Sequence, residues 1–204
     1  MRRLLVPGSL EVFEKAQACR TWPELATAAQ RCTACSELAA SRTTVVVGDK
    51  PPGARLALVG EAPGAEEDAS GRPFVGRAGR MLDELLAAAG LDRATVAVVN
   101  VLQCRPPGNR APKPDEVARC RGWLVRKLEL VAPELIVALG STAAAAFLGR
   151  GVKLGASRGV VHEVDGRRVL VTYHPSAAIR WGPNGAPRAA LAEDLKLAAT
   201  LLAR

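Results

Sequence analysis

The sequence predicts an α/β fold in which helices cover both faces of a parallel sheet. The chain has 204 residues, 49% of them hydrophobic, which is enough for one domain with a sizeable core. Short apolar runs alternate with stretches of helical pattern, an order typical of parallel strands joined by crossover helices. We therefore treat residues 1–204 as a single domain, with residues 1–31 as a helical extension.

The apolar runs indicate the strands, and turn residues indicate where each element ends. Thr21-Trp22-Pro23-Glu24 has the composition of a helix start within the extension. Asp165-Gly166 is typical of a type I′ hairpin. Strands are expected at residues 55–59, 96–99, 135–139, 160–164 and 168–173. Helices are expected at residues 77–89, 114–131, from 140 onward and 189–202.

Charge and hydropathy limit the classes of function. The net charge is +8 and the pI is near 9.8, which favours a polyanionic partner such as DNA or RNA, although a biased composition explains the charge equally well. Aromatic residues make up only 3%, which argues against a broad base-stacking platform. No apolar run reaches the roughly 20 residues of a membrane span, so we expect a soluble cytoplasmic protein with reduced thiols and no membrane partner.

Four of the five cysteines form two separated pairs. Cys32 and Cys35 make a C-x-x-C pair, whereas Cys104 and Cys120 flank a loop rich in proline and arginine. Thiolates in this arrangement suggest a metal or iron–sulfur centre that joins the N-terminal part to this loop. Unrelated buried cysteines are the alternative. Cys19 lies outside the pattern and is expected to be a free thiol.

Ligand sites in parallel sheets lie at the carboxyl ends of the strands. The turn 60–64 follows the first strand and leads into Glu66-Glu67-Asp68, but it lacks the lysine and serine or threonine of a phosphate-binding loop. Carboxylates there suit the activation of water or the stabilisation of positive charge, and a solvated acidic turn is the alternative.

Three further residues have an edge or face that fits a planar base. Phe74 lies on a loop between glycines and can stack, although an ordinary core position is its default interpretation. The carboxamide of Asn100, at the end of a strand, can pair with one base edge or cap a turn. His174 follows the last strand and can donate to an oxygen that gains negative charge, but a structural role is the alternative.

Together these stretches resemble the family 4 uracil-DNA glycosylases, the iron–sulfur branch of the uracil-DNA glycosylase superfamily. The resemblance extends from about Cys32 to the last helix. It is carried by Cys32-x-x-Cys35, Gly60-Glu61-Ala62-Pro63-Gly64, Gly71-Arg72-Pro73-Phe74-Val75-Gly76, Asn100-x-x-x-Cys104-Arg105-Pro106-Pro107, Asn109-Arg110-x-Pro112, Cys120 and His174-Pro175.

The resemblance implies a three-layer α/β/α sandwich with a central four-stranded parallel sheet. It also implies a DNA repair enzyme that acts on uracil in single- or double-stranded DNA, and we expect a monomer. A [4Fe–4S] cluster is implied, with zinc as the alternative metal, because four thiolates suit either. The implied ligands are Cys32, Cys35, Cys104 and Cys120.

The resemblance also assigns roles in the uracil pocket. Phe74 would stack on a flipped uracil, Asn100 would pair with O4 and N3–H, and His174 would stabilise the uracil anion near O2. Gly60 and Ala62 are expected beside the base. Ala62 stands where other branches carry an aspartate, and Gly64 stands where they carry an aromatic residue that excludes thymine.

The residue that orients water is less clearly marked. Glu61 and Glu67 are the candidates, ranked above Glu66, and Glu67 has the alternative of hydrogen-bonding Asn109 to brace a loop. DNA contacts are expected from a wedge residue, Ile179, and from polar and basic residues around it. These other residues are Ser176, Arg180, Arg105 and Arg110.

Three other functions compete with this one. A covalent uracil-binding relative would need a histidine on an inserted basic loop, and none lies between Asn100 and Cys120. A second rival is a DNA-binding module without activity, and the retention of site residues argues against it. These are Glu61, Phe74, Asn100 and His174. An iron–sulfur electron carrier would leave the same residues without a purpose.

Overall fold

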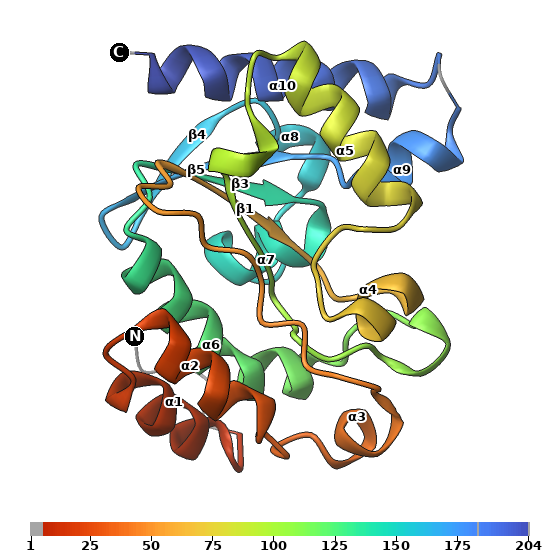
Figure 1. Cartoon of the computed structure of the whole chain (residues 1–204). Coiled ribbons are helices and arrows are strands. Elements are labelled where there is room, and N and C mark those ends of the chain that lie inside the picture. Colours follow the sequence, from red (N-terminus) through yellow and green to blue (C-terminus); the bar gives the residue numbers. More distant parts are fainter. Residues whose placement is uncertain (1–5, 183, 204) are drawn as a thin grey trace.

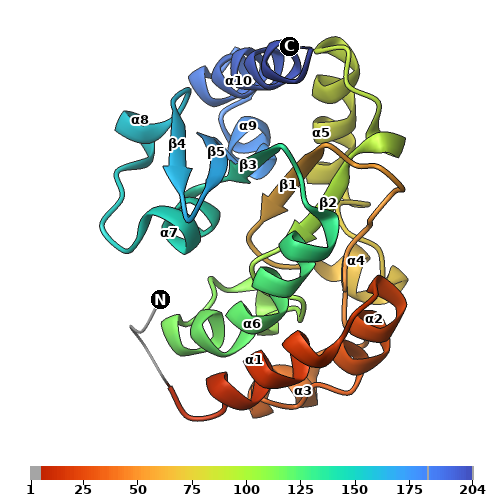
Figure 2. The ribbon, with the colours of Figure 1, turned by 90° about the vertical axis from the view of Figure 1, so that its left-hand side faces the viewer.

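The structure is a computed structural model, and it describes residues 6–182 and 184–203. A five-stranded sheet forms the middle layer, with the strand order β2-β1-β3-β5-β4. Figures 1 and 2 show this sheet with helices on both sides. The strands are β1 (Leu56–Gly60), β2 (Ala97–Asn100), β3 (Leu135–Leu139), β4 (Val161–Val164) and β5 (Arg167–Thr172).

Four of the strands are parallel, as the sequence predicts. β1 pairs with β2 and β3, and β3 pairs with β5, all in parallel. β4 adds an antiparallel edge, so the sheet is mixed and has five strands. The predicted hairpin joins β4 to β5 through Asp165 (φ 49°) and Gly166 (φ 74°). Both φ angles are positive, as a type I′ turn requires.

Two apolar cores hold the three layers together. On one face, α5 and α10 bury leucines such as Leu82, Leu86 and Leu195 against β1 and β3. On the other face, α6 and α7 cover the sheet with Leu124, Leu128 and several alanines. The helices of the sandwich are α4 (Ala65–Ser70), α5 (Arg77–Ala88), α6 (Pro114–Val131), α7 (Ser141–Leu148), α8 (Leu154–Ser157), α9 (Pro175–Arg180) and α10 (Ala186–Leu202), with short 3₁₀ turns at Arg93–Thr95 and Pro107–Asn109.

The N-terminal part packs on the outside of α6, and a third apolar core lies between them (Figure 2). It consists of α1 (Ser9–Ala18), α2 (Trp22–Gln30) and α3 (Ser36–Ser41). Thr21 caps α2 by accepting a hydrogen bond from the Glu24 amide at 3.4 Å, as the sequence predicts. No helix within residues 6–182 and 184–203 is long and apolar enough to cross a lipid bilayer.

Candidate active site

The sequence-predicted site residues gather at the carboxyl ends of the parallel strands. Gly60 and Asn100 end β1 and β2 and are directly opposite each other in the ladder. From β1 the chain crosses to β2 on one side, whereas β3 and β5 lie on the other side. Such a reversal of strand order opens a crevice, and this is where open α/β sheets bind ligands.

Phe74 comes to this edge from the loop between α4 and α5. Its side chain is 7% exposed, and its ring centroid lies 5.7 Å from that of His174, with the two rings tilted by 35°. Gly60 makes the approach possible. A Cβ atom on Gly60 would lie 2.4 Å from Asn100 Oδ1 and 2.6 Å from Phe74 Cζ. Glycine at position 60 is therefore required for Phe74 and Asn100 to stand side by side.

Glu67 braces the Phe74 loop. Its carboxylate accepts hydrogen bonds from the backbone amides of Gly64 at 3.0 Å, Val75 at 2.9 Å and Gly76 at 2.8 Å. Phe74 has a φ of 54°, a left-handed conformation that costs a phenylalanine about 1–3 kcal/mol. The three hydrogen bonds hold this conformation in place. The expected alternative for Glu67 was a bond to Asn109, whereas the structure directs its carboxylate to the Phe74 loop.

Asp68, next to Glu67, also binds backbone amides. It is 2% exposed and accepts hydrogen bonds from the amides of Thr43 and Thr44 at 2.9–3.3 Å. Glu66 is the exposed member of the three carboxylates, and its side chain lies 3.7 Å from Arg80. The acidic stretch is therefore largely a structural clamp, which its composition alone did not indicate.

Asn100 is 3% exposed, yet its side-chain oxygen has no hydrogen-bond partner within the described part of the chain. A buried acceptor without a partner costs about 1–3 kcal/mol, so it marks a place where a ligand donor gains most. Asn100 Oδ1 lies beside Gly60 and Phe74, where the edge of a base stacked on Phe74 would come.

His174 is neutral, and the structure indicates which nitrogen carries its proton. Burial lowers its pKa to about 4. Its Nδ1 accepts a hydrogen bond from the Ser176 amide at 3.1 Å, and the Ser176 hydroxyl lies 2.8 Å from the same atom. The proton is therefore on Nε2, which is left to donate. Gly140 lets the ring sit close, because a Cβ atom there would lie 2.9 Å from the His174 Cβ.

Glu61 and Ala62 follow β1 and are both half-buried. The Thr142 hydroxyl donates to one carboxylate oxygen of Glu61, and the other oxygen accepts no side-chain bond from the described residues. Asn109, in the loop after β2, is exposed and accepts a hydrogen bond from Arg105 at 2.7 Å. Asn109 therefore pairs with Arg105 in this structure.

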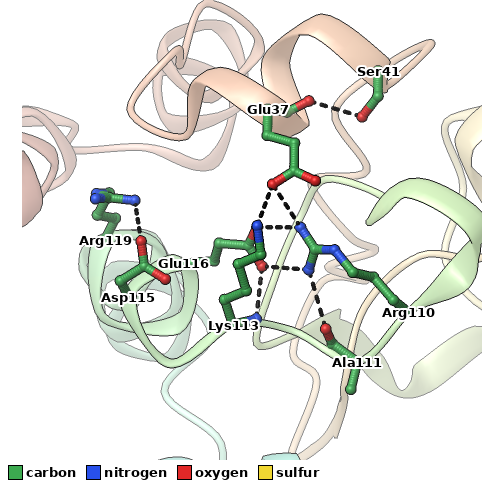
Figure 3. A network of polar contacts seen from close by, with 8 residues as sticks. All are labelled: Glu37, Ser41, Arg110, Ala111, Lys113, Asp115, Glu116 and Arg119. Carbon is green, nitrogen blue, oxygen red and sulfur yellow. Dashed lines mark hydrogen bonds and ion pairs between the residues drawn. The ribbon is translucent and has the colours of Figure 1, made fainter.

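Arg110 takes part in an ion-pair network, which Figure 3 shows. Its guanidinium binds the buried carboxylate of Glu116 at 2.6 Å, and it also lies 3.2 Å from Glu37 of α3. Lys113 contributes a second cation to Glu37. This network ties the loop that precedes α6 to the N-terminal helices. The predicted phosphate contact of Arg110 therefore competes with two carboxylates that already hold its charge.

The four predicted metal ligands line one small cavity between α3, α6 and the loop after β2. Burial raises the pKa of the Cys35 thiol to about 11 and also raises those of Cys104 and Cys120. Within residues 6–182 and 184–203, no three metal-binding side chains are grouped as ligands of one ion. The donor chemistry is nevertheless that of a thiolate-bound centre, because four cysteines from three segments face the same space.

Donors and cations surround these cysteines, and the sequence reasoning did not find them. The Trp123 indole donates to Cys32 Sγ at 3.4 Å, and Arg42 donates to Cys104 Sγ at 3.3 Å. Lys127 is 1% exposed; burial lowers its pKa to about 8, and the nearby thiols of Cys120 and Cys104 act in the opposite direction. A lysine is rarely so buried without a negative partner.

Three of the remaining predicted DNA contacts lie on α9, the helix that begins beside His174. Ser176 and Arg180 are exposed, whereas Ile179 is half-buried in the wall of a groove. Arg105 is also half-buried. The structure thus brings Ser176, Ile179 and Arg180 to one short segment, separate from the loop that holds Arg105 and Arg110.

Comparison with known proteins agrees with this geometry. The family model described as the uracil DNA glycosylase superfamily matches residues 47–196. The chain belongs to that superfamily. The type-4 uracil-DNA glycosylase of Thermotoga maritima is 44% identical over 175 residues, which cover 85% of this chain and 90% of that protein. The match confirms the resemblance to the family 4 uracil-DNA glycosylases.

Two further superfamily relatives show how specific the match is. The type-4 uracil-DNA glycosylase of Archaeoglobus fulgidus is 43% identical over 156 residues, covering 72% of this chain and 78% of that protein. A type-5 uracil-DNA glycosylase of Pyrobaculum aerophilum is 36% identical over 143 residues, covering 60% and 62%. Identity is therefore higher, over a longer stretch, to these two type-4 proteins than to the type-5 protein.

Proposed function

We propose that the chain is a uracil-DNA glycosylase, which flips deoxyuridine out of DNA and hydrolyses its N-glycosidic bond. The observation that carries this proposal is the unpartnered buried oxygen of Asn100 beside Phe74, whose ring lies 5.7 Å from that of His174. Uracil supplies the missing donor through N3–H. Cytosine has no proton on N3 and carries an amino group at C4, so it would leave both ends of the Asn100 amide unpaired.

The binding step uses a flat face and one polar edge. Phe74 stacks on the extruded base, a contact worth about 1–3 kcal/mol, and Gly60 lets Phe74 and Asn100 lie close together. Gly60 and Ala62 would lie beside the base. Asn100 Oδ1 accepts from N3–H, and its amide nitrogen donates to O4. Because Glu67 and Gly60 hold these side chains in place before the base arrives, binding the base costs little conformational entropy.

The bond-breaking step separates charge, leaving a uracil anion and a cationic sugar. The neutral His174 donates its Nε2 proton in a hydrogen bond to O2, where negative charge develops; losing such a donor typically costs about 2.7–4 kcal/mol of barrier. Glu61 orients the attacking water or offsets the positive charge of the sugar through its second oxygen. Glu67 is the weaker candidate for this role, because three backbone amides already occupy its carboxylate.

DNA is held mainly by charge. Arg105 and Arg180 bind phosphates, and Ser176 supports the segment that enters the DNA. Arg110 contributes to the local field while it orders the loop through Glu116. The enzyme acts as a monomer in the cytoplasm, on single- or double-stranded DNA, as a step of base excision repair.

Cys32, Cys35, Cys104 and Cys120 would hold a [4Fe–4S] cluster, which supplies structural order rather than chemistry in this reaction. The four thiols line one cavity, which suits a thiolate-bound centre, and the resemblance to the iron–sulfur branch of the superfamily favours the cluster over zinc. Arg42 and Lys127 lie beside the thiols and would stabilise the negative charge of either centre. Iron analysis and bleaching of the visible absorbance by dithionite distinguish the two metals.

Incubation with an oligonucleotide that contains one uracil, followed by alkali, tests the activity. Strand cleavage together with release of free uracil is expected, and the matched oligonucleotides with cytosine or thymine should stay intact. A covalent protein–DNA band would indicate a uracil trap instead. Binding without cleavage or a covalent band would indicate a module that has kept the fold and lost the activity.

A further inference from the structure

The indole of Trp181 is the most exposed large hydrophobic side chain of the described residues. Trp181 is 68% exposed, compared with 52% for Leu10 and 49% for Val160. It lies directly after α9, and its backbone is fixed on both sides. Its amide bonds to the Ala177 carbonyl at 3.0 Å, and a Cβ atom on Gly185 would lie 2.6 Å from the Trp181 carbonyl oxygen. The backbone is therefore held while the indole faces water.

Trp181 stands close to the proposed uracil pocket. His174 caps the N-terminus of α9 and Trp181 caps its C-terminus. At 1.5 Å per helical residue the two are about 10 Å apart along the axis. Base pairs rise about 3.4 Å each, so this distance corresponds to about three base-pair steps.

α5 and α9 lie side by side (Figure 1), and a groove lined in part by arginines lies between them. It has a volume of about 430 Å³. Arg77, Arg80 and Glu84 line it from one face of α5, and Arg188 lines it from α10. The lining holds three arginines and one acid. Arg188 lies 3.6 Å from Glu84 and Arg80 lies 3.7 Å from Glu66, so Arg77 is the lining arginine without an acidic partner among the described residues. Ile179 forms part of the wall and is half-buried, which leaves Trp181 as the residue that projects.

We propose that Trp181 is the wedge that stacks in the DNA next to the extruded deoxyuridine, and that this arginine groove binds the phosphates of the flanking strand. The proposal rests on the function proposed above. An indole replaces part of the stacking that flipping removes, and an apolar wedge of this kind keeps the duplex open. Ile179 then supports the wedge from behind, in place of the wedge role that the sequence predicted for it.

DNA fits these features better than an acidic protein segment does. An acidic peptide would use the arginines but would gain little from a flat indole that projects beyond them. A nucleic-acid strand uses both, because its phosphates and its bases alternate along the chain. Arginine also binds phosphate oxygens through two parallel hydrogen bonds, which suits a groove built from three of them.

The experiment compares Trp181→Ala and Trp181→Phe with the wild-type holoenzyme on duplex DNA containing uracil, and on a trinucleotide containing uracil. The alanine variant is expected to lose about tenfold or more in kcat/KM on the duplex, as for one lost base–aromatic stack, and much less on the trinucleotide. The phenylalanine variant should recover most of the loss. Inhibition by free uracil checks that the pocket is intact. Leu10→Ala, another exposed hydrophobic at a distant helix, is the matched control.

Binding at several salt concentrations tests the groove. Arg77→Gln and Arg188→Gln should each reduce the slope of log affinity against log salt by about one, whereas Arg20→Gln, exposed in the N-terminal part, should leave it unchanged. The proposal would be overturned if Trp181→Ala lost no activity, or lost the same factor in kcat/KM on the duplex and on the trinucleotide, relative to the wild type. Unchanged salt slopes in the groove variants would also overturn it. In both cases the proposed function would stand as long as the wild type releases uracil. If the wild type releases no uracil from either substrate, the proposed function itself fails.

Discussion

Replacing Glu67 by glutamine separates its structural role from a catalytic one. Glutamine keeps one acceptor oxygen, so it can retain the bonds to Val75 and Gly76 only as neutral ones, and its amide group then faces the Gly64 amide donor. A hydrogen bond to a charged group contributes about 1.5–3 kcal/mol, and a neutral one about 0.5–1.5. With allowance for partial exposure, the variant should lose about 2–4 kcal/mol of unfolding free energy.

Urea unfolding of samples with equal metal content measures this loss. Glu66→Gln is the matched control, because Glu66 is exposed and its one ion pair among the described residues is the 3.7 Å contact with Arg80; it should change stability by less than about 0.5 kcal/mol. The KM of Glu67→Gln should also rise, because Phe74 loses the contacts that hold its left-handed conformation. Unchanged stability with a fall in kcat on the order of 10³ would refute the brace and make Glu67 the catalytic carboxylate.

Four further results follow from the site. Asn100→Asp should lower uracil excision and allow some release of cytosine, because a carboxylate accepts from the cytosine amino group; unchanged selectivity would remove Asn100 from base recognition. For the pH profile of kcat/KM, neutral His174 is the active form, so activity should fall only as pH drops through about 4; a fall near 6.5 would contradict this. Gly60→Ala should lower activity on the order of 10² through the displacement of Phe74 and Asn100, and near-normal kinetics would count against the close contact. Cys120→Ser should lose bound iron and unfold more easily, whereas full iron content would exclude it as a ligand.

The strands and the site edge could be predicted from the sequence because their signals are local. Apolar runs placed β1 and β2 within one residue of their positions, and β3 was predicted without error. Asp165-Gly166 identified the hairpin because only a few residues accept two positive φ angles. Asn100 was placed at a strand end by the same pattern, and parallel pairing then brought it next to Gly60.

The braces could not be predicted, because their partners are backbone amides that carry no residue signature. Glu67 binds amides eight and nine residues away, and Asp68 binds amides on a segment 24 and 25 residues away. The ion-pair partners of Arg110 could not be predicted from the sequence either. Its charge predicts a phosphate contact, but only the fold shows that Glu116 and Glu37 lie within reach of its guanidinium. Charge alone does not reveal which partner an arginine meets.

The crystal structure of the protein soaked with uracil would show directly whether the base binds in the proposed pocket. We expect the base to stack on the Phe74 ring, with N3 within hydrogen-bond distance of Asn100 Oδ1 and O2 facing His174 Nε2. Uracil bound elsewhere, or bound here with its N3–H directed away from Asn100, would contradict the mechanism derived from these three side chains.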